Sequence, residues 1–249
     1  MREYLLFRLY GPLASWGDIA VGEYRPSYSY PSKSAICGLL AAALGIDRID
    51  DESHLDLSRS VQFALCVLAP GSLLRDYHTI QTPGNTRRHL STRKDELADR
   101  LNIATILSSR DYRMDAAYDA CISLKEDSQY DLAQIKGALE RPKYTLYLGR
   151  KSCVVALPLC PRLLQAESAL RALQAYETVL KDQEGGIKSE VSGLLAGGNS
   201  VTYLWEEDNS DEYTHIQTRR DSVLSRRRWQ FAERQEKYKM IGKERDIHV

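Results

Sequence analysis

The sequence lacks the spacings that build metal sites and disulfide frameworks. Its five cysteines, Cys37, Cys66, Cys121, Cys153 and Cys160, fall singly in apolar segments and include no C-x-x-C pair. This pattern argues against a zinc site or a disulfide scaffold and favours reduced core residues. The five histidines show no H-x-x-x-H or other ligand spacing, so we expect no metal and no cofactor.

Long hydrophobic runs and net charge are also missing. No segment is long enough to span a bilayer, and the first apolar run is too short for a signal peptide, so we expect a cytoplasmic protein. The 34 basic and 34 acidic residues cancel, so a nucleic-acid surface must arise from the distribution of charge. Residues 219–245 hold ten basic and four acidic residues, whereas residues 206–212 hold five carboxylates and no cation. This asymmetry predicts one end that attracts phosphate and another that repels it.

The segment 141–152 is the strongest candidate for a phosphate contact. It holds two tyrosines, one glycine, no carboxylate and four cations, namely Arg141, Lys143, Arg150 and Lys151. Glycine lets backbone N–H groups approach an anion, the cations supply countercharge, and tyrosine rings can stack on unpaired bases. The alternative interpretation is a solvated loop with its tyrosines packed inward.

A second candidate is the start of a predicted helix. Residues 32–45 predict a buried helix with Ser32 as the N-cap and Gly45 just after the end. Lys33 and Ser34 lie at its amino end, where the helix dipole and free N–H groups favour an anion. The glycines and the lysine do not have the order of a Walker loop.

Two further regions are candidates. The loop 12–30 contains Trp16 and Arg25; a loop tryptophan is usually a packing anchor, and base stacking is the alternative. Residues 75–113 hold eight basic and five acidic residues with little apolar periodicity. Such a long insertion in a compact domain indicates either an arm that clamps a partner or a solvated loop.

The order of the expected elements predicts the fold class. Strands are expected at 4–10, 61–68, 112–124 and 153–159, a second helix at 131–140, and an acidic linker at 47–56. This order is the α+β, ferredoxin-like (RRM-like) pattern, in which two helices cover one face of a four-stranded antiparallel sheet. We expect a domain over residues 1–161 with the insertion at about 75–113. A smaller, irregular, β-rich unit over 162–249 follows, with a short helix at 166–176, strand candidates at 189–205 and the basic end.

A catalytic constellation is hard to assemble from these residues. Acid–base cleavage of RNA would require a histidine, or a lysine and a tyrosine, beside the scissile phosphate. His78 is the one histidine in such company, next to Tyr77 and near Arg75. A histidine among cations is more often a phosphate or base contact than a general base. The residues therefore favour RNA binding, with a metal-independent endoribonuclease and a module that binds acidic proteins as the alternatives.

Four separated motifs carry a family resemblance. RLYGPLASWG, RPSYSYPSKSAICGLLAAALGI, LLRDYHTI and RPKYTLYLGRKSC occur in this order within residues 1–161, and RRWQFAER follows near the end. Together they resemble the CasD (Cas-five) family, RRM-like subunits of Cascade, the type I-E CRISPR surveillance complex. The resemblance implies a non-catalytic RNA-binding subunit that caps the 5′ handle of the CRISPR RNA. It also implies that the subunit links the backbone filament to the large subunit.

The resemblance also implies particular contacts. The handle would be held by Lys33, Ser34, Gly38, Tyr144, Tyr147, Gly149, Arg150, Lys151 and Ser152. A thumb opened by Arg75, Tyr77 and His78, with Arg87 and Arg88 near its tip, would fold over the RNA and contact the neighbouring backbone subunit. Type I-C relatives cut precursor RNA, whereas type I-E systems use a separate subunit, so no catalytic residue is expected. The partner of the cationic end stays open between RNA, target DNA near the protospacer-adjacent motif, and the large subunit.

Overall fold

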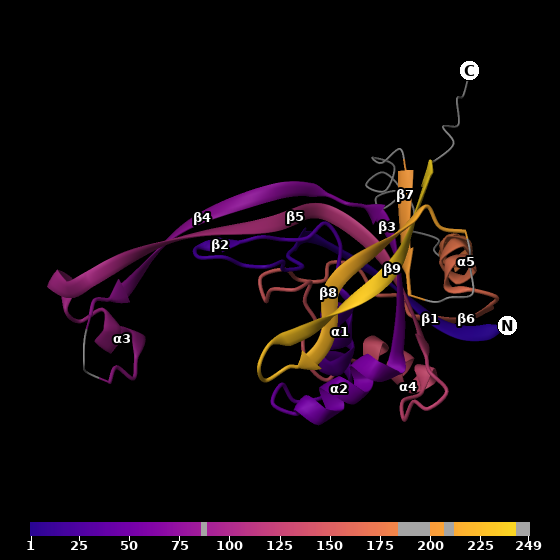
Figure 1. The fold of residues 1–249 in the computed structure, drawn as a ribbon, viewed down its shortest axis with the longest axis horizontal. Helices are drawn as coiled ribbons and strands as arrows, with labels where there is room; N and C mark the ends of the chain where they lie inside the picture. The colour runs from indigo at the N-terminus through magenta and orange to yellow at the C-terminus, as the bar shows by residue number, and fades with distance from the viewer. Residues whose placement is uncertain (86–88, 184–199, 207–211, 243–249) are drawn as a thin grey trace, which may run out of the picture.

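One twisted sheet organises the chain (Figure 1). The computed structural model describes all residues except 86–88, 184–199, 207–211 and 243–249. The strand order is β6-β1-β5-β3-β7-β9-β8, and neighbours along this path are antiparallel. The strands are β1 (Arg2–Ala14), β3 (Val61–Ala69), β5 (Ile103–Leu124), β6 (Arg162–Ala166), β7 (Ser200–Trp205), β8 (His215–Ser225) and β9 (Gln230–Gly242). Strands from both sides of residue 161 therefore belong to the same sheet.

Helices pack on both faces of this sheet. The helices are α1 (Lys33–Leu44), α2 (Asp51–Ser60), α4 (Leu132–Glu140) and α5 (Ala169–Gln183). Side chains alternate along a strand, and in β1 Leu5, Phe7 and Leu9 share a core with α1, α2 and α4. Tyr4 and Leu6 point the other way and share a core with α5. The sheet is thus a layer between two apolar cores.

A two-stranded hairpin extends away from this body, with α3 (Arg93–Glu96) at its far end (Figure 1). It is formed by β4 (Ser72–Pro83) and the first half of β5, paired from Ser72↔Met114 to Pro83↔Ile103. Strand β2 (Tyr24–Arg25) pairs with the same part of β5, and the 3-10 helix η1 (Arg100–Asn102) lies near the tip. The sequence indicated little regular structure here because no side chain of β4 is fully buried, so the strand lacks the apolar alternation of a half-buried strand.

Three sequence predictions about the elements need correction. Residues 153–159 are not a strand: they make one isolated bridge, Tyr147↔Val154, and the edge strand beside β1 is β6. The apolar side chains of Cys153 and Leu159 are buried without a ladder, and Pro158 lies in the same run. The acidic linker 47–56 contains the start of α2, where Asp50 accepts a hydrogen bond from the Ser53 N–H. The first strand also continues past Gly11 to Ala14.

Other local predictions are confirmed. Ser32 caps α1 by accepting a hydrogen bond from the Ala35 N–H, and Gly45 follows the helix with a φ of 80°. Asp131 caps α4 in the same way. The expected helix at 166–176 is α5, which begins at Ala169. The strand candidates at 189–199 lie outside the described residues. No helix in the described ranges is long and apolar enough to cross a membrane.

Candidate nucleic-acid interface

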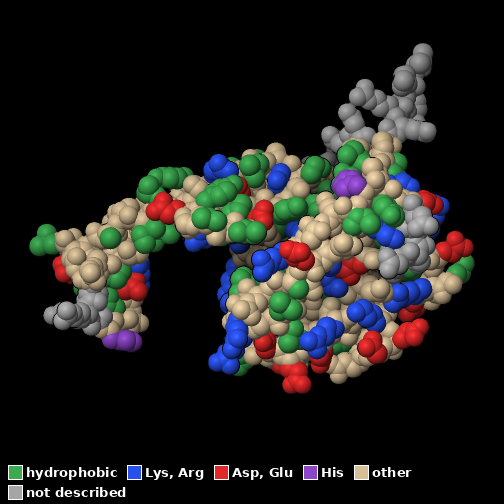
Figure 2. Space-filling view, viewed as in Figure 1, with side chains coloured by type: hydrophobic (Ala, Val, Ile, Leu, Met, Phe, Trp, Pro, Cys, Tyr) green, Lys and Arg blue, Asp and Glu red, His purple; other side chains and the backbone are tan. Residues whose placement is uncertain are grey.

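A cavity of about 1000 Å³ lies where α1, the basic loop 141–152 and the β8–β9 turn meet. The described residues that line it include four cations and one carboxylate, namely Arg48, Arg150, Lys151, Arg226 and Asp47. Five aromatic rings also contribute: Trp16, Tyr144, Tyr147, Trp229 and Phe231. Figure 2 shows Lys and Arg side chains gathered along the edge of the body beneath the projecting hairpin. Cationic and aromatic linings of this kind suit a single-stranded nucleic acid.

The basic loop is fixed at both of its ends. The Lys143 N–H donates to the Ala43 carbonyl oxygen (3.0 Å), near the carboxyl end of α1. Further along, the Leu148 carbonyl accepts a hydrogen bond from the Ser15 N–H (3.0 Å), and the Leu148 side chain is fully buried. Between these anchors Tyr144 and Tyr147 stay 45% and 38% exposed. The stretch that carries the two tyrosine rings is therefore held by backbone hydrogen bonds on both sides.

Gly149 is the position where this loop requires glycine. Its φ is +91°, and a Cβ built there would lie 1.8 Å from the carbonyl oxygen of Ser15. We expect Gly149→Ala to lower the free energy of unfolding by at least about 1–2 kcal/mol, because it adds a backbone clash to the cost of a left-handed conformation. Urea unfolding followed by circular dichroism measures this loss.

Gly137 provides the matched control for this prediction. It lies inside α4, and a Cβ there would meet nothing within 4 Å. Gly137→Ala is expected to raise the free energy of unfolding by about 0.5–1 kcal/mol, since alanine favours the helix. Equal stability of the two alanine variants would contradict the close packing of Gly149 against the Ser15 backbone, directly after β1.

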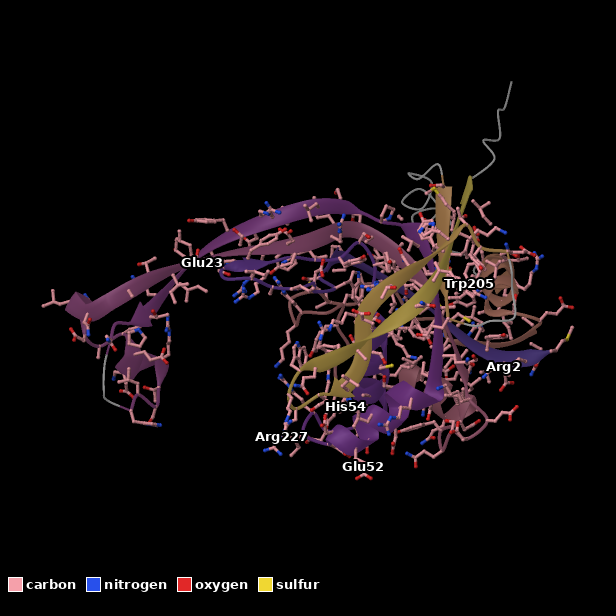
Figure 3. The ribbon with its side chains drawn as sticks, in the orientation of Figure 1. Arg2, Glu23, Glu52, His54, Trp205 and Arg227 are labelled. Atoms are coloured by element: carbon pink, nitrogen blue, oxygen red, sulfur yellow. The ribbon has the colours of Figure 1, made fainter. Side chains whose placement is uncertain are left out.

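The turn between β8 and β9 brings another cationic segment to the cavity. Asp51, in the first turn of α2, accepts hydrogen bonds from the backbone N–H groups of Arg226 (2.5 Å) and Arg227 (3.1 Å) and from the Ser225 hydroxyl (3.0 Å). Although burial raises the pKa of Asp51, these hydrogen bonds outweigh it and hold the pKa below its usual range. Figure 3 shows Arg227 at this turn beside the helix that carries His54.

Arg226 enters the cavity from this turn. Its guanidinium lies over the ring of Trp229 at 4.6 Å, and that ring meets Phe231 edge-on at 5.7 Å. Trp229 itself is 57% exposed. Gly38 of α1 faces the same guanidinium, since a Cβ on Gly38 would approach its Nη2 atom to 3.3 Å. The sequence marked the region 226–245 as cationic, but nothing in the pattern placed Arg226 and Trp229 beside α1.

Eight of the residues that the sequence singled out line this cavity: Trp16, Ser34, Gly38, Tyr144, Tyr147, Gly149, Arg150 and Lys151. Trp16 is 5% exposed and donates its indole N–H to the Tyr118 hydroxyl (3.1 Å), so it is also the packing anchor that a loop tryptophan usually is. Arg150 lies over the Tyr112 ring at 4.9 Å, which orients its guanidinium.

Lys33 does not line the cavity. Its Nζ atom is 2.9 Å from Glu206 Oε2, and its backbone N–H donates to Asp221 Oδ2 (2.8 Å). The start of α1, where the sequence predicted an anion site, is therefore partly occupied by carboxylates of the chain itself. Arg25 is exposed, does not line the cavity and donates to the Gly22 carbonyl (2.5 Å). Ser152 is also exposed and does not line the cavity.

The remaining candidates lie on the projecting hairpin. Arg75 pairs with Asp111 through two hydrogen bonds (2.8 and 3.2 Å). These bonds, helped by the Tyr24 hydroxyl, hold the pKa of Asp111 below its usual value although burial raises it. His78 Nε2 is 2.5 Å from Asp76 Oδ2, and Tyr77 is 61% exposed. Arg87 and Arg88 lie outside the described residues. Within the described part of the chain, no three His, Cys, Asp or Glu side chains are grouped as metal ligands.

An antiparallel sheet between two helical layers, with a cationic and aromatic cavity beside α1, defines the class of protein to which this chain belongs. The chain belongs to the family described as "CRISPR-associated protein (Cas_Cas5)", whose model matches residues 4–236. It is 36% identical over 202 residues to the CRISPR system Cascade subunit CasD of Escherichia coli (strain K12), covering 77% of this chain and 83% of that protein.

Two solved structures have the same fold. One is a chain of a CRISPR RNA-guided surveillance complex, with a TM-score of 0.64, 26% identity, and coverage of 96% of this chain and 90% of that chain. The other is described as the crystal structure of a Cas protein, with a TM-score of 0.56, 24% identity, and coverage of 97% and 96%. The family resemblance read from the four sequence motifs is therefore confirmed.

Proposed function

We propose that this chain is a non-catalytic, cytoplasmic subunit of a type I-E Cascade complex that binds and caps the 5′ handle of the CRISPR RNA. The cavity is the observation that carries the proposal. Its described lining places four cations against one carboxylate and adds exposed tyrosine and tryptophan rings. Such a surface binds RNA through phosphate charge and base stacking, without requiring a duplex.

The proposed RNA surface consists of the cavity-lining candidates together with Arg48, Arg226 and Trp229. Lys33 is left out, because Glu206 neutralises its charge inside the fold. The order β6-β1-β5-β3 with α1 and α4 supports the ferredoxin-like interpretation, since it is the order of a split βαβ fold. The division into units 1–161 and 162–249 stays a prediction.

The projecting hairpin is proposed as the thumb that contacts the neighbouring backbone subunit and helps to link it to the large subunit. It exposes large apolar side chains along both strands: Leu73, Leu74, Tyr77, Ile106 and Leu107. A monomer gains nothing from exposing such a row, whereas a partner protein could bury it.

The placement of His78 supports a non-catalytic role over the endoribonuclease alternative. His78 lies on β4, pairs with Asp76, and is absent from the cavity lining. A general base must lie within hydrogen-bond reach of the proton that it removes. Incubation of the purified chain with repeat RNA in EDTA tests this directly, and cleavage that disappears in His78→Ala would establish the alternative.

The binding role is tested at the basic loop. We expect Arg150→Ala/Lys151→Ala to weaken binding of handle-containing RNA by about tenfold or more, because two countercharges at the cavity are lost. The slope of log affinity against log salt concentration should fall by roughly 0.7 for each lost phosphate contact. Fluorescence anisotropy over a salt series gives both quantities.

Lys136→Ala is the control for this experiment. Lys136 is a partly exposed cation on α4 that pairs with Glu140 (2.7 Å) and does not line the cavity. Its removal should leave the affinity within about twofold and the salt slope unchanged, since an exposed ion pair contributes little. If both variants lose the same affinity, the chain binds RNA by diffuse charge and the basic loop is not the site.

A further inference from the structure

One corner of the cavity brings together three cationic or titratable side chains, two of which carry a buried nitrogen atom without a hydrogen-bond partner among the described residues. Arg48 follows α1, His54 belongs to α2, and Arg226 comes from the β8–β9 turn. His54 is 8% exposed, and its Nε2 atom has no hydrogen-bond partner among the described residues. The Nε atom of Arg226 is buried and equally unpartnered within the described ranges. Buried polar groups are normally paired, so these atoms call for an explanation.

The charges at this corner repel one another. Burial lowers the pKa of Arg226, and the charge of Arg48 lowers it further. Burial also lowers the pKa of His54, and Arg226 is the next cause in the same direction. The backbone of Asp47 and the carboxylates of Asp50 and Asp51 act in the opposite direction without reversing the shift. An arrangement that costs free energy in the unbound chain suits a bound anion.

The backbone holds these side chains in place. Asp51 fixes the backbone of Arg226, and the same carboxylate belongs to the helix that carries His54. The stacking of Arg226 on Trp229 then leaves an exposed ring at the rim of the corner. A nucleotide could therefore place its phosphate among the cations and its base against the tryptophan ring.

We propose that Arg48, His54 and Arg226 form a subsite for one internal phosphate group of the bound RNA, with the adjoining base on Trp229 and His54 as a cation once the phosphate is in place. This inference rests on the proposed RNA-binding function and assigns one position of that site. A phosphate would neutralise the repulsion from Arg226 and accept hydrogen bonds from the unpartnered nitrogens. The preference of His54 for its neutral form would then be reversed.

The coupling between RNA binding and the protonation of His54 has a definite sign. In the unbound chain the pKa of His54 lies below its ordinary value, whereas a phosphate beside the imidazole raises it. Binding therefore takes up a proton, and affinity should increase several-fold as the pH falls from about 8 to about 6, a range that spans the ordinary histidine pKa. The RNA must carry a 5′-hydroxyl, because a terminal phosphomonoester titrates in the same range.

The experiment uses the full chain and a repeat-derived, 5′-hydroxyl RNA of about ten nucleotides, within the site sizes of single-strand binders. The RNA is synthesised with one uncharged methylphosphonate linkage at each successive position. In the wild type, we expect one linkage to cost about tenfold in affinity. In the Arg226→Ala and Arg48→Ala variants, the same methylphosphonate linkage should lower the affinity little further, because a cation that contacts this phosphate is already absent. His54→Gln should bind RNA with an affinity that does not vary over this pH range.

The outcomes separate this inference from the function on which it rests. A wild-type chain that binds no RNA overturns both. A wild type that binds RNA, with linkage profiles and pH dependence unchanged in all three variants, overturns the subsite alone and leaves the proposed function standing. Lys136→Ala, which should keep the wild-type profile, shows that loss of any surface cation is not enough. Urea unfolding confirms that each variant is folded at the assay temperature.

Discussion

Arg234→Leu is expected to lower the free energy of unfolding by about 3–5 kcal/mol, the cost of removing one partner from a buried ionic cluster. Arg234 pairs with Asp221 through two hydrogen bonds of 2.8 Å, with Glu236 at 2.7 Å and with Glu206 at 3.2 Å. The side chains of Asp221 and Glu236 are 5% and 2% exposed. Without the guanidinium, these carboxylates are left buried close together with too little countercharge.

Urea unfolding followed by circular dichroism measures this loss, and Arg220→Leu is its control. Arg220 lies on β8, the strand paired with the Arg234 strand β9, is exposed, and makes one hydrogen bond to the Phe231 carbonyl (3.1 Å). Its replacement should cost about 1 kcal/mol or less. If Arg234→Leu is as stable as the control, the cluster does not hold the β8–β9 hairpin to the sheet.

The Arg234 cluster also bears on the cavity. Its members come from β8, from β9 and from Glu206 directly after β7, and Asp221 additionally accepts the N–H of Lys33 at the start of α1. The same hairpin carries Arg226 at its turn. Any Arg234→Leu protein that stays folded should therefore also bind RNA more weakly, because the turn loses part of its support.

Much of the fold could be predicted because its signals are local. Ser32 and Gly45 mark both ends of α1, and Asp131 marks the start of α4. The basic loop 141–152 was also visible, since it lacks carboxylates. The hairpin was harder to predict, because β4 has no buried side chain to produce apolar alternation.

The other parts of the site depend on contacts between distant residues. The hydrogen bond from the Arg226 backbone N–H to Asp51 joins residues 175 positions apart, and no spacing rule predicts it. Lys33 shows the opposite case: a cation at a helix start suggests an anion site, but Glu206, which follows β7, and Asp221 of β8 already bind it. Local patterns identify cations, whereas the tertiary structure decides which of them remain available.

A buried ion pair lies on the face of the sheet that packs against α5. Arg8 and Asp119 are cross-strand neighbours on β1 and β5, joined by two hydrogen bonds of 2.8 and 3.0 Å, with side chains 11% and 2% exposed. Burial raises the pKa of Asp119, and Arg8 opposes that shift. Arg8→Met should therefore lower the free energy of unfolding by about 3–5 kcal/mol, because it leaves the carboxylate buried and unpaired.

The pH dependence and the double variant make this prediction sharp. With its folded-state pKa raised above the unfolded value, Asp119 binds a proton more readily in the native state, so the Arg8→Met protein should regain stability as the pH falls toward the folded-state pKa. Arg8→Met/Asp119→Leu should recover most of the loss at neutral pH, since an apolar pair carries no desolvation cost. Urea midpoints at neutral and acidic pH measure both effects. A double variant as unstable as Arg8→Met would mean that the volume and shape of Arg8, packed near Tyr176 of α5, matter more than its charge.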